Sequence, residues 1–316
     1  MEMPTKISDW LSREEIAQFT QRSDWHAGRV LLLNWAMIAA TFWMVSVWTN
    51  PVTIIVAVIL LGGRQMGLAG LMHEAGHKTF FKTQALNRWL GQWLCAYPIL
   101  GDCDAYGASH REHHKMAGTD ADPDLPNYRS YPVSKASFRR KVIRDLTGQT
   151  GIRNLRGIFF GRSRNMMMRD GEHYPAGKGL LANLVLLGVL VAFGVGELYL
   201  LWMLAYITTY SLVARLRQVA EHGAVAGLFD PDPRRHTRTI LANPLECLLI
   251  CPNHLNYHAE HHFAASVPGY RLKDFHRKLV AKGFYDQHPQ TLTKGYWEVL
   301  KQAVPEFDPA TAPLAT

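Results

Sequence analysis

Nine histidines recur in this chain at spacings that suit metal binding. Histidines three or four positions apart lie on one face of a helix, and adjacent histidines point about 100° apart, so a box with both can supply two neighbouring ions. The groups are His73-x-x-x-His77, His110-x-x-His113-His114, a lone His222, and His258-x-x-His261-His262. A structural zinc ion takes four protein ligands and a catalytic one three, whereas imidazole also suits iron, and oxygen chemistry needs open coordination positions. The series therefore predicts two iron ions.

Six further histidines fall outside the series. The chain has 15 histidines, and five of them are expected on the surface or satisfied in the core: His26, His173, His236, His276 and His288. His254 lies one helical turn before His258, and we expect it beside the ligands and not among them. Glu74, Glu221 and Asn253 are candidates for the same supporting position, because ligand imidazoles usually donate their other N–H to a nearby group.

Three other cofactor sites share parts of this pattern. His73-Glu74-Ala75-Gly76-His77 satisfies the HExxH motif of zinc metalloproteases, and at a membrane helix end it suggests an intramembrane protease, which leaves seven histidines unused. Glu74 with His77 also fits half of a ferritin-like carboxylate site, which needs a second Glu-x-x-His on another helix. Paired histidines on facing membrane helices can hold haem, but a haem site of this kind would not need the tandem HxxHH boxes. The zinc protease stays as a distant alternative.

Four apolar segments are about long enough to cross a bilayer. They are residues 30–48, 52–72, 179–196 and 198–214, and Arg64 with Gln65 interrupts the second. The first 29 residues are polar and mixed in charge, so we expect no signal peptide. The chain is expected to be an all-α integral membrane protein with four transmembrane helices in two hairpins. Residues 73–178 and 215–304 would form a cytoplasmic helical cap. The spans and the cap together make one membrane domain, residues 30–304. A cytoplasmic N-terminal segment, residues 1–29, precedes this domain, and a flexible tail, residues 305–316, follows it.

The distribution of cations predicts the orientation. Residues 1–29 carry 4 Lys and Arg, residues 73–178 carry 17 and the chain after Ala214 carries 12, whereas the two short turns carry none. The positive-inside rule then places both termini and every histidine box on the cytoplasmic side, in a bacterial inner membrane. The net charge of +8 fits attraction to anionic headgroups, or an acidic electron donor at Arg139–Arg144. No nucleic-acid module is present.

Two connecting regions and the four cysteines carry further predictions. Residues 84–101, with several Trp and Tyr, are expected at the membrane interface. Asp120-x-Asp122-Pro-Asp124 lacks the glycine and terminal glutamate of an EF-hand, so a solvated turn is expected. The four cysteines lie on the reducing side in this topology and are expected as free thiols.

The histidine boxes resemble those of the membrane fatty acid desaturase superfamily, in its bacterial form. The resemblance covers roughly residues 30–280 and rests on HEAGH at 73–77, HREHH at 110–114 followed by GTDADPD at 118–124, and HAEHH at 258–262. Gln218-Val219-Ala220-Glu221-His222 resembles the family segment in which one more histidine binds metal. In that segment an amide, here Gln218, holds a metal-bound water.

The resemblance implies a di-iron centre held by the nine histidines, which activates O2 with two electrons from a separate ferredoxin or cytochrome. It implies a fatty acyl lipid substrate and a cis double bond as the product. A di-iron hydroxylase of lipid, alkane or carotenoid is the nearest alternative, because the same boxes serve both reactions. The chain has no His-Pro-Gly-Gly segment of a fused cytochrome b5, so neither bound haem nor flavin is expected.

Overall fold

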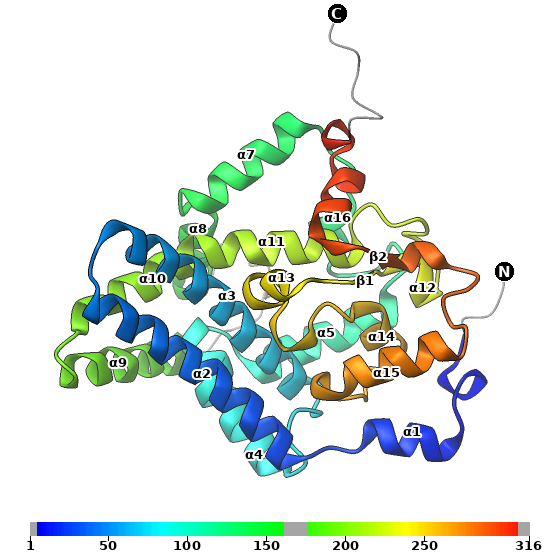
Figure 1. Ribbon diagram of the computed structural model, residues 1–316, viewed down its shortest axis with the longest axis horizontal. Helices are drawn as coiled ribbons and strands as arrows, with labels where there is room; N and C mark the ends of the chain where they lie inside the picture. The colour runs from blue at the N-terminus through cyan, green and yellow to red at the C-terminus, as the bar shows by residue number, and fades with distance from the viewer. Residues whose placement is uncertain (1–4, 161–175, 309–316) are drawn as a thin grey trace, which may run out of the picture.

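The computed structural model describes residues 5–160 and 176–308, which are mostly helical (Figure 1). The helices are α1 (Arg13–Thr20), α2 (Asp24–Val47), α3 (Pro51–Gly76), α4 (Gln84–Leu90), α5 (Cys103–Met116), α6 (Leu125–Tyr128), α7 (Lys135–Leu146), α8 (Gln149–Phe160), α9 (Ala176–Ala192), α10 (Tyr199–Ile207), α11 (Thr209–His222), α12 (Pro233–His236), α13 (Pro244–Leu249), α14 (His258–Phe263), α15 (Gly269–Ala281) and α16 (Gly295–Ala303). Short 3-10 segments are Ile7–Asp9, Tyr97–Ile99, Gly196–Leu198, Pro252–His254, Pro289–Thr291 and Pro305–Phe307, and Gly91–Ala96 is a π-helix. Strand β1 (Thr239–Ile240) pairs in parallel with β2 (Leu292–Thr293).

Within residues 5–160 and 176–308, three helical stretches are long and apolar enough to cross a membrane. They are Asp24–Val47, Pro51–Gly76 and Gly196–His222, the last of which joins α10 to α11. The predicted span 198–214 therefore continues to the lone histidine of the series. Helix α9, expected to form the span 179–196, is apolar but has 17 residues. The fold is a helical membrane protein, and four spans in two hairpins remain a prediction.

The start of α3 follows from its sequence. The Asn50 side chain accepts hydrogen bonds from the backbone N–H groups of Val52 and Thr53, and Pro51 occupies the first turn, where its missing N–H costs nothing. The helix runs past the predicted end at Met72 to Gly76. His73 and Glu74 therefore belong to the membrane helix itself.

Helix α3 is the centre of the molecule. It packs against α2, α5, α10 and α11, and every residue from Leu61 to Gly76 is buried. The guanidinium of Arg64, which interrupts the predicted span, has oxygen acceptors inside the protein, although its Nε has no partner among the described residues. It donates to the backbone oxygen of Leu248 and, at 3.4 Å, to the side-chain oxygen of Asn34. The second half of α3 can therefore carry polar groups while buried.

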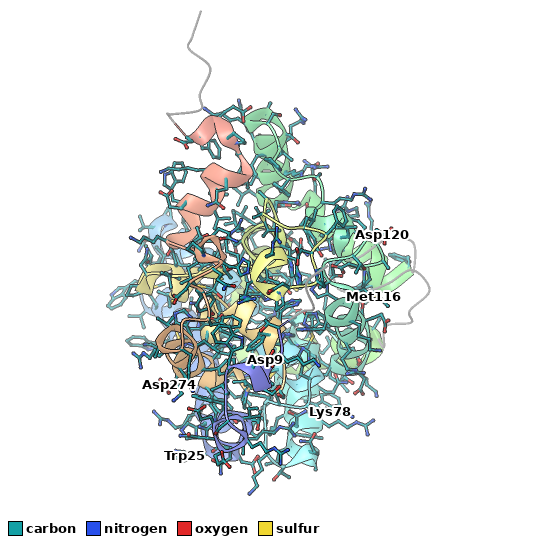
Figure 2. All side chains as sticks on the ribbon, turned by 90° about the vertical axis from the view of Figure 1, so that its right-hand side faces the viewer. Asp9, Trp25, Lys78, Met116, Asp120 and Asp274 are labelled. Atoms are coloured by element: carbon teal, nitrogen blue, oxygen red, sulfur yellow. The ribbon has the colours of Figure 1, made fainter. Side chains whose placement is uncertain are left out.

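Many of the large exposed apolar side chains belong to helices at one end of the molecule. Helices α2, α9 and α10 occupy the left of Figure 1 and carry many of the large exposed apolar side chains, among them Trp43, Leu184 and Leu200. The short helices α12, α14 and α15 and the two strands lie on the right. Figure 2 views the molecule from that end, where Lys78, Asp120 and Asp274 are labelled.

The predicted tail only partly lies within the described residues. Residues Pro305–Phe307 form a 3-10 turn, whose Phe307 ring packs against the Trp297 ring of α16. Residues 309–316 lie outside the described part of the chain, as does His173.

Candidate metal centre

Five histidines form one group, hereafter the five-histidine group, around converging ring nitrogens. It consists of His73, His77, His110, His114 and His261, whose candidate ligand atoms all lie within 4.8 Å of one another. The Nε2 atom of His73 lies 2.8 Å from that of His110 and 3.1 Å from that of His77. The Nε2 atom of His114 lies 3.0 Å from that of His110 and 2.9 Å from that of His261. Three segments of the chain, α3 with its C-terminal cap, α5 and α14, therefore direct imidazoles at one point.

The remaining four histidines form a second group, hereafter the four-histidine group. It consists of His113, His222, His258 and His262, again with candidate ligand atoms within 4.8 Å of one another. The Nε2 atoms of His222 and His258 are 2.8 Å apart. Adjacent histidines divide between the groups, since His113 and His262 lie here while their neighbours His114 and His261 lie in the other. All nine histidines of the series are thus brought together as two adjoining groups.

The nitrogen spacing fits metal ions better than it fits hydrogen bonding. Two nitrogens about 2.1 Å from one ion at right angles are about 3.0 Å apart, close to the observed separations. A neutral imidazole has one N–H and one lone pair, so the Nε2 of His73 cannot bond well to two other Nε2 atoms at once. In addition, the buried Nε2 of His262 has no hydrogen-bond partner among the described residues. The donor set therefore fits two ions that prefer nitrogen ligands, such as iron.

The crossing of α3 and α5 sets the geometry of the five-histidine group. Gly76 and Gly107 meet there, and a Cβ atom on Gly107 would lie 2.8 Å from the carbonyl oxygen of Gly76 and 2.9 Å from its Cα. No other residue type allows the two backbones this close without a shift. The close approach brings His73 and His77 within reach of His110 and His114.

The four-histidine group is oriented by polar partners. His113 Nδ1 pairs with Oδ1 of Asp122 at 2.8 Å, and Tyr128 donates its hydroxyl to the other oxygen of that carboxylate. His222 Nδ1 donates to the backbone oxygen of His236 at 3.1 Å. Such bonds place the proton on Nδ1 and leave the Nε2 lone pair for a metal.

Burial keeps most of the rings outside the membrane helices neutral. It lowers the pKa of His77 to about 4, and it lowers the pKa of His114, His258 and His261 well below the usual value. His110 and His262 are lowered in the same way. Neutral imidazole is the form that binds metal, so these rings are ready to act as ligands near pH 7.

His113 is the exception among them. Burial alone would lower its pKa, but the hydrogen bond to Asp122 and the nearby charges of Asp124 and Glu221 outweigh burial and raise it. The pKa of Asp122 is lowered in turn: burial would raise it, but the bonds from His113 and Tyr128 prevail. A negative carboxylate thus lies behind one ring of the four-histidine group.

The residues predicted to support the histidine ligands lie at different distances from the two groups. Glu221 lies near the site, with its carboxylate 3.7 Å from Nδ1 of His258. Gln218 lines a cavity together with His222. Glu74 instead accepts from the backbone N–H of Gly269 at 2.8 Å and so joins α3 to α15. Asn253 donates to the backbone oxygen of Gly67, and His254 belongs to neither histidine group.

Two supporting carboxylates were not predicted. The Asp120–Asp124 segment was expected to be a solvated turn, which is wrong for Asp122, because its side chain is buried against His113. Glu260, inside the third box, is fully buried and accepts hydrogen bonds from Thr239 and Tyr285, with the ring of His276 against the same carboxylate. An aspartate soon after a histidine box is a signal that could have indicated the first, whereas the sequence predicts His276 only on the surface or satisfied in the core.

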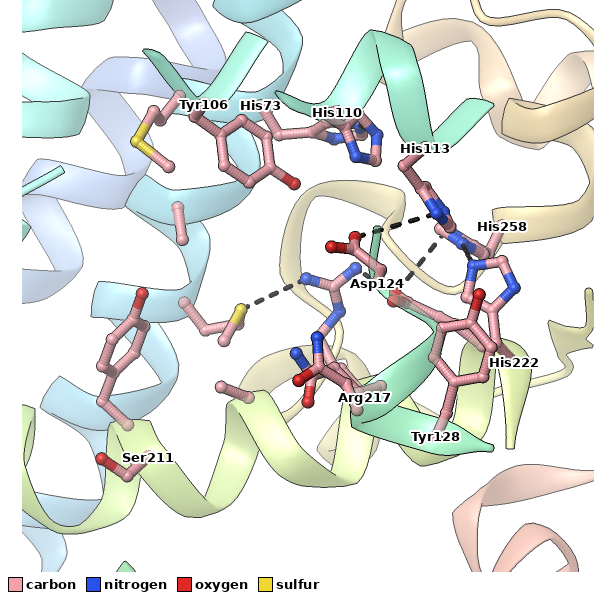
Figure 3. Close-up of a pocket in the computed structure, with 18 of the residues that line it drawn as sticks. His73, Tyr106, His110, His113, Asp124, Tyr128, Ser211, Arg217, His222 and His258 are labelled. Atoms are coloured by element: carbon pink, nitrogen blue, oxygen red, sulfur yellow. Dashed lines mark hydrogen bonds and ion pairs between the residues drawn. The ribbon is translucent and has the colours of Figure 1, made fainter. Parts of the chain in front are cut away.

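A cavity of about 110 Å³ opens beside both groups (Figure 3). Histidines of both groups line it, including His73, His113 and His222. The other described lining residues are polar or aromatic for the most part: Met66, Ala69, Met72, Tyr106, Asp124, Asn127, Tyr128, Asn154, Tyr206, Tyr210, Ser211, Ala214, Arg217, Gln218 and Glu221. The site therefore has room for a reactant next to the converging imidazoles.

Comparisons with known proteins agree with this geometry. Residues 46–295 match the family model described as fatty acid desaturase. The chain is 28% identical over 292 residues to dihydrorhizobitoxine desaturase of Bradyrhizobium elkanii, which covers 83% of this chain and 80% of that protein. It is 25% identical over 220 residues to a sphingolipid delta(4)-desaturase DES1-like of Oryza sativa subsp. japonica, covering 68% and 60%. A shorter match links the chain to an sn-1 acyl-lipid omega-3 desaturase (ferredoxin) of Synechocystis sp., with 36% identity over 69 residues. This match covers 22% of this chain and 18% of that protein.

Proposed function

This chain belongs to the fatty acid desaturase family, and from this premise we propose that it is an O2-dependent di-iron desaturase of a fatty acyl substrate. One observation carries the proposal: nine imidazoles converge as two adjoining groups, and two boxes supply ligands to both. The HExxH histidines lie in a group of five, which a zinc protease does not need. Iron with nitrogen ligands supplies the oxidising power for an unactivated C–H bond.

The proposed reaction balances with an external reductant. One O2, two electrons and two protons, with the two hydrogens removed from neighbouring carbons, give one cis double bond and two waters. The given sequence has no His-Pro-Gly-Gly segment of a fused cytochrome b5, and we propose a separate ferredoxin or cytochrome as donor. The excess of cations in residues 73–178 and after Ala214 supports a cytoplasmic site in a bacterial inner membrane.

Several residues of the chain prepare the site. The histidines would hold the two ions, with Asp122 and the His236 carbonyl fixing two of the rings. Gln218, in the cavity wall, would hold a metal-bound water. The lining residues would shield the reacting carbons from bulk solvent, which would protect the oxidant from side reactions.

The proposal is tested by product analysis and metal content together. The full chain is expressed in a bacterial host with simple lipids and a competent donor, and acyl chains are profiled by mass spectrometry. We expect new double bonds and about two irons per purified chain, both lost in His261→Ala and kept in His288→Ala, a histidine outside both groups. Hydroxylated products in place of double bonds would favour the hydroxylase, and one zinc with no change in lipids would contradict the proposal.

A further inference from the structure

A buried guanidinium lies against the end of the helix that carries His222. It belongs to Arg238, which is 2% exposed and directly precedes strand β1. Its Nη1 and Nη2 donate to four backbone oxygens, and Nη2 also donates to Oε1 of Gln302 in α16 at 2.9 Å. The backbone oxygens are those of Val219, Ala220, Gly223 and Ala224, at 3.4, 2.9, 3.1 and 3.0 Å. Acceptors from α11, from the turn that follows it and from α16 therefore surround one positive charge.

The position of this charge suits the end of a helix. The last turn of an α-helix leaves carbonyl groups without N–H partners, and the helix dipole makes that end partly negative, so a cation there is stabilising. Helix α11 ends at His222, and Nη1 of Arg238 bonds to the carbonyls of Ala220 and Gly223, one on each side of that histidine. In the described part of the chain no carboxylate forms an ion pair with Arg238. The end of α11 is therefore what balances its charge.

The turn after His222 has an uncommon backbone conformation. Ala224 has a φ of +52°, in the left-handed region that is unfavourable for a residue with a Cβ atom. The backbone oxygen of this residue accepts from Nη2 of Arg238 at 3.0 Å. The arginine therefore holds the chain in a turn that alanine would otherwise avoid.

The neighbours of Arg238 hold two other parts of the four-histidine group. Two positions earlier, the backbone oxygen of His236 accepts from Nδ1 of His222 at 3.1 Å. One position later, Oγ1 of Thr239 donates to the carboxylate of Glu260 and accepts from the backbone N–H of the residue before it, at 3.3 Å. Both of those residues lie in the third histidine box. Arg238 therefore fastens to α11 the same short segment that orients the ring of His222 and contacts the third box.

A second buried arginine nearby has a different set of partners. Arg234 in α12 is 8% exposed. Its guanidinium pairs with Asp232 and donates to the backbone oxygen of Phe284 at 3.3 Å, and neither partner belongs to α11 or to a histidine box. Two buried arginines four positions apart therefore differ in what they hold, and Arg238 is the one bonded to the metal-facing helix.

We propose that Arg238 is a positioning residue of the metal centre, which bonds to the backbone on both sides of His222 and thereby sets the affinity of the four-histidine group for its ion. This role rests on the proposed function for the presence of two ions, and it adds a residue outside the histidine series. Arg238 acts through the backbone of His222 and binds no metal itself.

Cobalt(II) can count the two sites without turnover. The full chain in detergent is stripped of metal and equilibrated with Co²⁺ at a chelator-buffered concentration that just fills both sites of the wild-type protein. Arg238→Lys keeps the charge, but a single ammonium group cannot reach the carbonyls on both sides of His222 as the planar guanidinium does. We expect about 10–100-fold weaker binding of one ion, identified by its Co²⁺ absorption spectrum as the ion lost in His222→Ala. Wild-type affinity for both ions, or equal weakening of both, would overturn the inference.

Arg234→Lys is the matched control. It makes the same replacement at the other buried arginine, and both Co²⁺ ions should bind as in the wild-type protein even if the melting temperature falls. Loss of an ion from this variant too would show that any disturbance of the region empties the site, which would also overturn the inference.

A milder pair of variants applies if Arg238→Lys does not fold. Gln302 is exposed, so Gln302→Met should fold, and it removes one acceptor of the Arg238 guanidinium. We expect it to weaken the same ion about 3-fold or more. Gln290→Met, at an exposed position that bonds to His288 and not to Arg238, should leave both ions unchanged. Equal Co²⁺ binding by these two variants would overturn the inference.

The two proposals fail in different ways. If the iron-loaded wild-type protein desaturates lipid and Arg238→Lys holds both Co²⁺ ions as tightly as the wild-type protein, the positioning role fails and the desaturase proposal stands. If Arg238→Lys loses the ion of the four-histidine group but the wild-type protein oxidises no lipid with iron, O2 and a donor present, the positioning role stands and the proposed function fails.

Discussion

The two histidine groups differ in what holds their rings in place. In the four-histidine group, a carboxylate and a backbone carbonyl accept from ring Nδ1 atoms. In the five-histidine group, no hydrogen bond to an Nδ1 atom occurs within residues 5–160 and 176–308, and the buried Nδ1 of His261 has no partner. Its rings are instead placed by the close crossing of α3 and α5. One group is therefore oriented by electrostatic partners and the other by backbone packing.

This difference has a consequence for metal binding. A carboxylate behind a ligand imidazole raises its basicity and strengthens the metal bond. A group oriented by helix packing has no such support, but its position depends on the whole bundle. We therefore expect the two ions to respond to different substitutions, and both groups to respond to pH.

The largest expected effect is the loss of stability of the metal-free protein in acid. Histidine in the unfolded chain titrates near about 6.5, whereas burial lowers the folded pKa of His77 to about 4 and lowers those of His114, His258 and His261. Between these values the unfolded chain binds more protons, so stability falls as pH falls. Each group contributes up to about 1.4 kcal/mol per pH unit.

His113 should oppose this trend. Its pKa is raised, so its contribution is fully present below about 6.5 and is lost as pH rises through the folded value. Thermal melts of chelator-treated protein between about pH 7.5 and 4 would measure the balance. We expect a melting temperature that falls steadily below about pH 6.5, with the iron-loaded protein protected over part of this range. A flat profile would show that the rings are not buried as neutral groups.

The sequence was sufficient to predict which histidines of a box share a helix face. The reason is local: spacings of three and four place side chains on one face of a helix whatever the rest of the fold does. That the boxes and the lone His222 meet at one site was implied by the family resemblance. The division of His113 from His114, and of His261 from His262, follows from the same angular offset. The apolar runs likewise predicted membrane helices, although α3 extends beyond its run to carry His73.

Features that depend on tertiary geometry could not be predicted in this way. The Asp122 side chain reaches His113 because the chain turns at Gly118, whose φ is +80°, and nothing in the composition of that loop distinguishes Asp122 from the exposed Asp120. Gly107 looks like any helical glycine until α3 is placed across it. The unpartnered Nε of Arg217 likewise becomes visible only in the folded structure.

An intermediate effect is expected from Asp122→Asn, which tests the electrostatic half of the comparison. The amide can still accept from His113 Nδ1, but it carries no charge. Removal of such a partner typically weakens metal affinity by about 10–100-fold, and we expect one of the two irons to be lost first in a chelator competition. Asp120→Asn, in the same loop but exposed, is the control. Equal weakening of both ions would mean that the groups are not held independently.

The smallest expected effect is that of Gly107→Ala, which tests the packing half. The new Cβ would lie 2.8 Å from the carbonyl oxygen of Gly76, so α3 and α5 must separate, and such overpacking costs about 1–3 kcal/mol. Alanine recovers about 0.5–1 kcal/mol of helix propensity, which leaves a net loss of up to about 2.5 kcal/mol. Gly188→Ala in α9 is the control, because nothing lies within 4 Å of the added atom. This variant gains helix propensity without overpacking, so its stability should be unchanged or higher.

The two alanine variants together decide whether packing places the five-histidine group. A lower melting temperature for Gly107→Ala than for Gly188→Ala, with weaker binding of the iron that Asp122→Asn leaves unaffected, would support separate control of the two ions. If Gly107→Ala were as stable as Gly188→Ala and kept both irons, the contact between Gly76 and Gly107 could not be what brings His73 and His77 to His110 and His114. The rings of that group would then have to be held by the metal itself.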